Sequence, residues 1–312
     1  MGKLKEHLSK KIPDWRYNYR QLLDEKGDQV TSTVTINTAY SGMKGVKGMI
    51  CDTSSVTADA GLHVRGKHIL DLVDLKPEEI LYLLLIGELP NEEELLDLQH
   101  ELKERSVVPD YVWKVLSGMP KDSHPMAMFN TAILSMQKES KFAEAYDLVV
   151  SKGDYWESTL EDGLNIIAKL PAIGAAVYRL RFEKGDRLEA GDSVDWSENF
   201  LQMMGLDYSN DMLKMMQLYL MLHCDHEGGN VSTFSALTVN SALSDPYYSL
   251  SAGLNGLAGP LHGLANQNNL KFVLDIIEHY NGVPSDEQLK EFSWDRLNLS
   301  LIHISEPTRL RS

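Results

Sequence analysis

The chain has 312 residues, of which 43% are hydrophobic and 24% are charged, so it is long enough for one large domain or two smaller ones with their own cores. Its formal net charge of −15 at pH 7 disfavours non-specific binding to nucleic acid or to an anionic membrane, because both carry charge of the same sign. No apolar run approaches the ~20 residues of a membrane span, so we expect partners that are neither nucleic acid nor membrane.

The N-terminal part is predicted to hold one long helix and a few short strands. Apolar residues at roughly helical spacing, from Leu4 to Leu22, predict an amphipathic helix over residues 1–28 that packs as an arm. The alternation over residues 30–36 and the segment 49–53 favour short strands. The β component is therefore expected to be small.

The rest of the chain carries helical signals separated by short turns. Pro77 fits a first helical position, with Gly87 just past the end of that helix, and Asn91 forms a capping box with Glu94. The predicted helices cover residues 77–86, 91–105, 111–116, 126–137, 155–182 (bent or broken at Pro171), 211–225, 232–243, 246–256, 260–279 and 287–297. This pattern predicts a mainly α fold.

The most informative segment is NGLAGPLHGLANQ, residues 255–267, which sets His262 among glycines where a helix is predicted to begin at Pro260. The partial positive charge of a helix N-terminus opposes an imidazolium there. A neutral histidine can donate a hydrogen bond to a carbonyl or enolate oxygen, which suits enolisation. From spacing alone, a histidine that caps or packs a helix start is an equal alternative.

A second segment, HCDHEGGNVS at residues 223–232, ends a helical run and opens into glycines. His223 and His226 lie three apart, but the HxxHE order matches neither the HExxH nor the HxxEH zinc pattern, so we expect no metal site. Three segments together closely resemble citrate synthases: HCDHEGGNVS, SALSDPYYS at residues 241–249, and the segment around His262. The resemblance extends over residues 1 to about 298.

The resemblance implies the mainly α, citrate-synthase-like fold and the reaction that opens the tricarboxylic acid cycle. In that reaction acetyl-CoA, oxaloacetate and water give citrate and CoA. A carboxylate base removes a methyl proton while one histidine donates to the thioester oxygen and a second histidine donates to the ketone oxygen. Acetyl-CoA is a substrate and no bound cofactor is implied. The family is homodimeric, so we expect a homodimer.

The resemblance also implies roles for individual residues. His262 matches the catalytic histidine that hydrogen-bonds the acetyl thioester oxygen, and Ser232 matches a serine that orients its ring. His226 and Asn230 are expected to bind oxaloacetate. The glycines Gly228 and Gly229 would let the backbone approach the substrate.

Two lysines match positions that help to bind the phosphates of coenzyme A. These are Lys152 and Lys44. Lysines in polar turns are more often only solvated, so that alternative stays open for both.

The family pattern does not continue to the end of the sequence. After residue 298 it would run into a glycine-rich segment with the second catalytic histidine, but residues 299–312 match nothing in it and His303 lacks the glycine context. We expect residues 299–312 to be a non-native tail, residues 1–263 to form the large helical domain, and residues 264–298 to be the start of a small domain that is mostly missing. The chain as written should then lack turnover.

Two other functions and two compartments stay open. A 2-methylcitrate synthase that uses propionyl-CoA would share both histidine segments, and a non-catalytic helical binding or scaffold protein could derive from the same fold. Cys51 and Cys224 form no paired framework, which favours a reducing compartment. The first residues lack the apolar core of a secretory signal, so we expect a cytoplasmic protein, with the mitochondrial matrix as the alternative.

Overall fold

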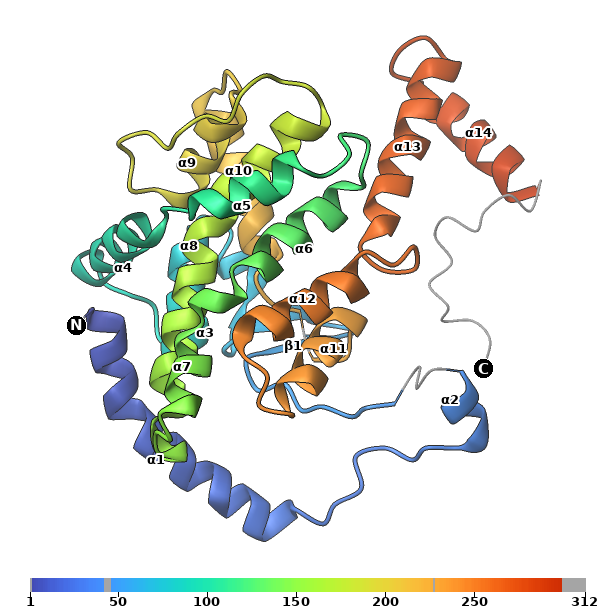
Figure 1. Ribbon diagram of the computed structural model, residues 1–312. Helices are drawn as coiled ribbons and strands as arrows, with labels where there is room; N and C mark the ends of the chain where they lie inside the picture. Colours follow the sequence, from blue (N-terminus) through green and yellow to red (C-terminus); the bar gives the residue numbers. More distant parts are fainter. Residues whose placement is uncertain (1, 42–45, 227, 299–312) are drawn as a thin grey trace.

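The computed structural model describes residues 2–41, 46–226 and 228–298, and it confirms the mainly α fold (Figure 1). The helices are α1 (Lys3–Lys26), α2 (Ile36–Tyr40), α3 (Pro77–Ile86), α4 (Glu92–Arg105), α5 (Asp110–Ser117), α6 (Pro125–Ser135), α7 (Lys141–Asp147), α8 (Tyr155–Arg181), α9 (Trp196–Met204), α10 (Asn210–Leu222), α11 (Val231–Asn240), α12 (Pro246–Leu257), α13 (Leu264–His279) and α14 (Asp286–Asn298). The strands β1 (Ser54–Thr57), β2 (Gly61–Val64) and β3 (Lys67–His68) form an antiparallel sheet in the order β1-β2-β3. Single 3-10 turns lie at Ile69–Asp71, Gln137–Glu139 and Lys152–Asp154.

The predicted helix ends agree best with the structure where the sequence supplies capping residues. Gly87 follows α3 with a φ of +85°, a left-handed conformation that few residues other than glycine adopt. At the start of α4 the side chain of Asn91 accepts a hydrogen bond from the backbone N–H of Glu94 at 3.0 Å, and Glu94 accepts one from the Asn91 N–H at 2.8 Å. The long helix α8 runs without a break through Pro171.

The two predicted strands at residues 30–36 and 49–53 are wrong. Residues 29–35 have no regular structure, Ile36 begins α2, and the hairpin lies further along, at residues 54–68. Alternating β-branched residues form a strand only when a neighbouring strand pairs with them, and residues 30–35 have no such neighbour in the structure as described.

Besides α2, two further helices, α7 and α9, were not predicted, and both follow a side-chain cap. Ser140 accepts a hydrogen bond from the Ala143 N–H at 3.0 Å, and Asp195 accepts one from the Glu198 N–H at 2.9 Å. The capping residues before short apolar segments were the signal that could have identified both helices.

The core lies on both sides of α8, which runs through the middle of the body in Figure 1. Ile166, Ile173 and Val177 on one face pack in a cluster with residues of α5, α6 and α12. Leu160 and Leu164 on another face pack with residues of α1, α3 and α4. Because α8 contributes to both clusters, it fixes the N-terminal helices and α12 relative to each other.

A third apolar cluster joins the β hairpin to α3 and α10. Val64, Leu72, Ile80, Leu83 and Met221 are all buried in it. Met221 is the penultimate residue of α10, so this cluster anchors the end of that helix and the start of the loop that follows it.

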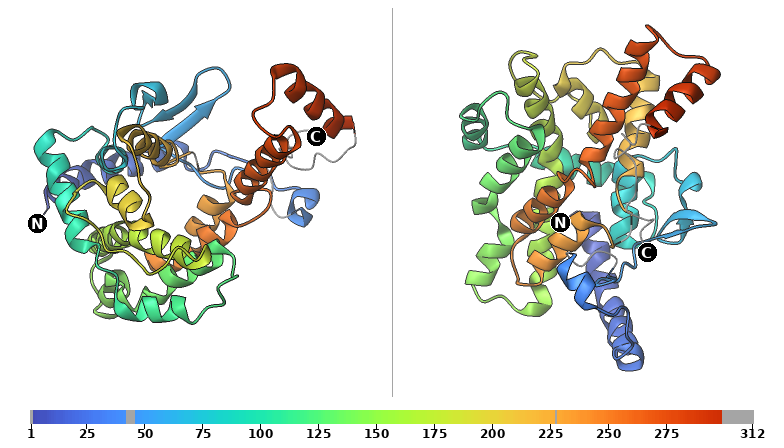
Figure 2. Two further views of the ribbon diagram at one scale, coloured as in Figure 1. Left: turned by 90° about the horizontal axis from the view of Figure 1, so that it is seen from above. Right: turned by 90° about the vertical axis from the view of Figure 1, so that its right-hand side faces the viewer.

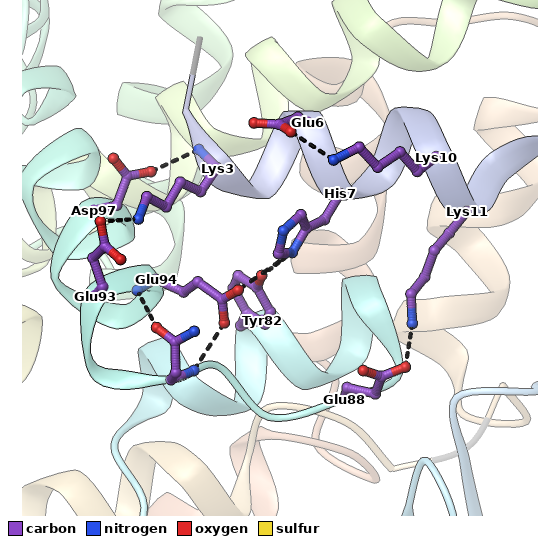
Figure 3. A network of polar contacts seen from close by, with 11 residues as sticks. Lys3, Glu6, His7, Lys10, Lys11, Tyr82, Glu88, Glu93, Glu94 and Asp97 are labelled. Atoms are coloured by element: carbon purple, nitrogen blue, oxygen red, sulfur yellow. Dashed lines mark hydrogen bonds and ion pairs between the residues drawn. The ribbon is translucent and has the colours of Figure 1, made fainter.

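The arm α1 docks on α3 and α4 through a row of polar contacts (Figure 3). Nδ1 of His7 lies 2.6 Å from the hydroxyl of Tyr82 and 3.6 Å from a carboxylate oxygen of Glu94. Further along α1, Lys11 pairs with Glu88 at 2.5 Å. The predicted helix over residues 1–28 is therefore confirmed as an arm that packs on the body, although such exposed ion pairs add little stability individually.

The last two helices, α13 and α14, extend away from the body in the views of Figures 1 and 2. They pack on each other through Phe272 and Phe292, whose ring centroids are 5.8 Å apart, and Ile276 of α13 is buried. Other apolar side chains of α13 remain exposed, including Leu270 and Leu274. This part of the chain therefore has a smaller core than the body.

A buried carboxylate lies where α3, α4 and α9 meet. Glu78 is 2% exposed, and its Oε1 accepts hydrogen bonds from Gln99 Nε2 at 3.0 Å and from the Trp196 N–H at 2.9 Å. Its Oε2 is buried with no partner among the described residues. Burial raises the pKa of Glu78 above its ordinary value, and nearby Asp195 raises it further.

This raised pKa predicts that Glu78→Gln stabilises the fold at neutral pH. Because the Glu78 pKa is higher in the folded than in the unfolded chain, the folding stability falls as the pH rises from the ordinary glutamate pKa to the folded pKa. Urea unfolding should show a gain of about 1 kcal/mol at pH 7 that shrinks as the pH falls toward the ordinary glutamate value. Glu104→Gln, on an exposed position of α4, is the control and should change little. A gain that grows under acid conditions would contradict the assignment.

Candidate functional site

The candidate site is built where α11 and α12 approach each other closely (Figure 1). A Cβ atom placed on Gly253 would lie 3.0 Å from the backbone oxygen of Ser232 and 3.3 Å from Cβ of Ala236. A Cβ on Gly256 would lie 3.1 Å from Cγ1 of Val231. The two glycines of α12 therefore let the first turn of α11 lie directly against the α12 backbone.

The turn after α12 carries His262. The backbone N–H of His262 donates to the carbonyl of Gly259 at 3.0 Å, which makes Pro260 the second residue of a tight turn. The predicted helix start at Pro260 is therefore wrong: α13 begins at Leu264, because the fixed φ of the proline serves the turn. His262 lies two residues before the first residue of α13, outside the helix.

Gly263 fixes this turn against the end of α12. A Cβ on Gly263 would lie 2.5 Å from the backbone oxygen of Leu257 and 2.7 Å from its Cδ1. No other residue fits there without a shift of the backbone. Steric crowding therefore requires a glycine directly after His262.

The ring of His262 contacts the start of α11. Its Nε2 lies 2.7 Å from Oγ of Ser232, and the same Oγ lies 2.7 Å from Oδ1 of Asn230. Asn230 is the N-cap of α11, where its Oδ1 also accepts a hydrogen bond from the Thr233 N–H at 2.9 Å. The structure thus brings together His262, Ser232 and Asn230 in one chain of polar contacts.

The loop that carries His226 is held against residues 48–54. Thr53 donates a hydrogen bond from its hydroxyl to Asp225 Oδ2 at 2.5 Å. A Cβ on Gly228 would lie 3.5 Å from Cβ of Cys51, so the buried backbone of Gly228 passes close to that segment. His226 itself is exposed, and Gly229 has open space around its Cα.

His226 makes no direct polar contact with the other candidate residues in the part of the chain that the structure describes. Four peptide units separate it from Asn230, so their Cα atoms are at most ~14 Å apart. Their short separation along the chain limits this distance, and no described contact joins His226 to the Asn230–Ser232–His262 chain.

Of the two lysines, only Lys152 lies in the described part of the chain, and it makes no contact with the other candidate residues. Lys152 is exposed at the turn before α8, where the neighbouring Gly153 carbonyl accepts a hydrogen bond from Arg16 of α1. Lys44 lies outside the described residues.

Four residues that shape the site were not predicted from the sequence, namely Thr53, Asp225, Gly253 and Gly256. Asp225 lies inside the HCDHEGGNVS segment, directly before His226, and this position was the available signal. The glycines at 253 and 256 are three apart in a helix, the spacing that puts small residues on one face. Nothing local in the sequence points to Thr53, whose partner is 172 positions away.

Among the described side chains, no group of three or more His, Cys, Asp and Glu residues could hold a metal ion. No helix in these ranges is both long and apolar enough to cross a membrane. A cavity of about 380 Å³ between α4, α5, α8 and α9 is lined by Trp113, Trp196 and Asn199 among others, and by none of the candidate residues.

Comparison with known proteins gives one family. The family model for the citrate synthase C-terminal domain matches residues 42–302. The chain is 39% identical over 305 residues to the mitochondrial citrate synthase of Saccharomyces cerevisiae, a match that covers 95% of this chain and 64% of that protein. The peroxisomal citrate synthase of the same yeast is 40% identical over 305 residues, with 66% of it covered.

A solved structure agrees with the sequence matches. The citrate synthase of Pyrobaculum aerophilum superimposes with a TM-score of 0.71 at 30% identity, over 80% of this chain and 63% of that one. The chain thus spans 64% of the length of the yeast mitochondrial relative, and the citrate-synthase-like helical fold is confirmed.

The close helix contact predicts opposite effects for two glycine-to-alanine substitutions. Gly163→Ala in α8, where a Cβ meets nothing within 4 Å, should stabilise the chain by up to ~1 kcal/mol through helix propensity. Gly253→Ala should destabilise it by about 1–3 kcal/mol, because the new methyl group overpacks against the backbone of Ser232. Urea unfolding of both variants gives the comparison. Equal stabilisation by the two changes would refute the close approach of α11 and α12.

Proposed function

Because this chain belongs to the citrate synthase family, we propose that the protein condenses acetyl-CoA with oxaloacetate and water to give citrate and CoA. The observation that carries the proposal is the contact of 2.7 Å between Ser232 Oγ and His262 Nε2, in a turn that Gly263 allows to pack closely against the end of α12. A histidine held at one ring nitrogen can present the other nitrogen to a substrate oxygen.

In the proposed reaction His262 donates a hydrogen bond to the acetyl thioester oxygen. This donation stabilises the enol that forms when a carboxylate base removes a methyl proton. The enol carbon then attacks the ketone carbon of oxaloacetate, and water hydrolyses the citryl thioester that results. Ser232 positions the His262 ring throughout.

Oxaloacetate is proposed to bind at the loop before α11. His226 is exposed and can donate to a ligand oxygen, and Asn230 offers its amide group. The backbone at Gly228 and Gly229 allows close approach of a carboxylate. The hydrogen bond between Thr53 and Asp225 supports this assignment because it holds the residue next to His226.

The 312 residues carry only part of the proposed catalytic set. The resemblance implies an aspartate base, a second histidine and carboxylate-binding arginines beyond residue 298, and residues 299–312 do not match that pattern. We therefore propose that this chain by itself does not turn over, that residues 1–263 form the large domain, and that residues 264–298 begin the small domain.

No bound cofactor is proposed, since acetyl-CoA enters as a substrate. Lys152 and Lys44 remain proposed contacts for the phosphates of coenzyme A. The exposure of Lys152 is compatible with that role, but its turn lies beside α1 and away from the contacts of His262.

The protein is also proposed to form a homodimer and to lie in the mitochondrial matrix. Exposed apolar side chains on α10 and α11 support a surface that a second copy covers, namely Met215, Tyr219, Leu222 and Leu237. The yeast relatives are named as mitochondrial and peroxisomal enzymes, which favours the mitochondrial matrix over the cytoplasm that the sequence led us to expect.

A chimaera tests the function. Residues 1–298 of this chain are joined to the remaining C-terminal part of the yeast mitochondrial relative, and citrate formation from acetyl-CoA and oxaloacetate is measured. The chimaera should form citrate, the 312-residue chain should not, and His262→Ala in the chimaera should lower turnover by at least ~100-fold, as expected for a lost transition-state hydrogen bond.

The control is His223→Ala, because the His223 ring bonds the Tyr219 carbonyl at 2.6 Å and has no proposed role in catalysis. A folded chimaera with no activity, or with activity that survives His262→Ala, is incompatible with the proposal. The same assay with propionyl-CoA decides between citrate and 2-methylcitrate formation.

A further inference from the structure

The loop that carries His226 starts from a helix end that is well fixed. Nδ1 of His223 lies 2.6 Å from the carbonyl oxygen of Tyr219. The thiol of Cys224 donates a hydrogen bond to the carbonyl of Leu220 at 3.3 Å. Both contacts return to α10 and hold the chain only as far as residue 224. The position of His226 therefore depends on what holds the residues that follow.

Asp225 makes the next contact, and it reaches a distant segment of the chain at Thr53. Oγ1 of Thr53 lies 2.5 Å from Oδ2 of Asp225, and both side chains are partly buried. A carboxylate only accepts, so the threonine hydroxyl is the donor. Hydrogen bonds from a hydroxyl to a carboxylate are short and roughly twice as strong as those between neutral groups. This contact therefore links the loop firmly to a segment 172 positions away.

Thr53 is itself fixed by the β hairpin and by α3. Its carbonyl accepts a hydrogen bond from the Arg65 N–H at 2.7 Å. The next residue, Ser54, begins β1 opposite Val64 of β2. The Arg65 side chain donates from Nε and Nη2 to the Leu84 carbonyl of α3, at 3.0 and 2.7 Å. Thr53 thus belongs to a well-supported part of the body, which is what a group that positions another residue requires.

His226 is joined directly to the residue that Thr53 holds. Only one peptide bond separates it from Asp225, so their Cα atoms are about 3.8 Å apart and a shift of Asp225 moves His226 as well. The His226 side chain is exposed and makes no polar contact with the described residues, so the backbone on either side determines where its ring lies. A misplacement of about 1 Å at a positioned group can lower a reaction rate by ~100-fold.

We propose that Thr53 is a positioning residue for the oxaloacetate site. Its hydroxyl holds the Asp225 carboxylate against the segment before β1, and this contact fixes the loop so that His226 can donate to the substrate. Thr53 does not touch the substrate and acts only through Asp225. The part of this inference that concerns oxaloacetate rests on the proposed function, whereas the link between the hairpin and the loop does not.

Two substitutions of Thr53 separate its hydroxyl from the rest of the side chain. Thr53→Val keeps the branched shape and removes the donor, whereas Thr53→Ser keeps the donor and should preserve the wild-type behaviour. Thr159→Val is the matched control, because Thr159 is exposed on α8 and its hydroxyl donates to the Tyr155 carbonyl of the same helix at 2.8 Å.

The first measurement uses the 312-residue chain without ligand and reads the backbone order parameters of Asp225 and His226 by ¹⁵N NMR relaxation. The wild type, Thr53→Ser and Thr159→Val should show the values of a rigid backbone, about 0.85, and Thr53→Val should fall below about 0.6. Wild-type values in Thr53→Val, or values in Thr53→Ser as low as those in Thr53→Val, overturn the proposal.

The second measurement uses the chimaera of residues 1–298 with the C-terminal part of the yeast relative and determines KM for each substrate. Thr53→Val should raise the KM for oxaloacetate by about 10-fold or more, because a hydrogen bond from His226 to a charged group is weakened, and should leave the KM for acetyl-CoA within about twofold. Thr53→Ser and Thr159→Val should match the parent. A merely structural role of Thr53 would lower kcat through loss of folded enzyme and leave both KM values unchanged, and that result overturns the proposal.

The two measurements separate failure of the inference from failure of the proposed function. If the loop loosens in Thr53→Val while the KM for oxaloacetate in an active chimaera stays at the parent value, the positioning role is overturned. If the parent chimaera forms no citrate, the proposed function fails, and the order parameters alone decide whether Thr53 holds the loop.

Discussion

The close approach of α11 to the glycine face of α12 is the constraint on which the candidate site depends. Glycine inside a helix lowers helix stability by about 0.5–1 kcal/mol relative to alanine, and α12 contains two glycines three residues apart. In return the N-terminal turn of α11 comes near enough to the turn after α12 for Ser232 to reach His262. A larger residue at Gly253 would separate the two partners that the proposed chemistry needs together.

The body and the last two helices differ in how firmly they are packed. The loop with His226 starts from Met221 in a buried cluster and is tied by Asp225 to Thr53 beside the hairpin. Beyond His262 the chain leaves the body as α13, which keeps apolar side chains such as Leu270 exposed. His262 therefore lies at the junction between a well-packed region and one with little core of its own.

Much of the helical architecture could be predicted, because capping residues and apolar periodicity are local signals. Pro77, Gly87 and Asn91 marked helix ends that the structure confirms. The strands at 30–36 and 49–53 were wrong, since pairing in a sheet depends on distant partners. Pro260 was assigned to a helix start, but the same fixed φ suits the turn that the glycines around it favour.

The candidate site could be predicted only in part. Its residues can be identified from short segments of the sequence, but the contacts between them join segments that are far apart in the chain. The histidine segments around His226 and His262 carried a family resemblance, whereas the hydrogen bond from Thr53 to Asp225 joins residues 172 positions apart. No spacing rule connects such a pair.

A double-mutant cycle with Ser232→Ala and His262→Ala, followed by urea unfolding, tests most directly whether these two residues interact as described. The account predicts a coupling energy of about 0.5–1.5 kcal/mol for a partly buried hydrogen bond. Additive effects of the two substitutions, with no coupling, would contradict it.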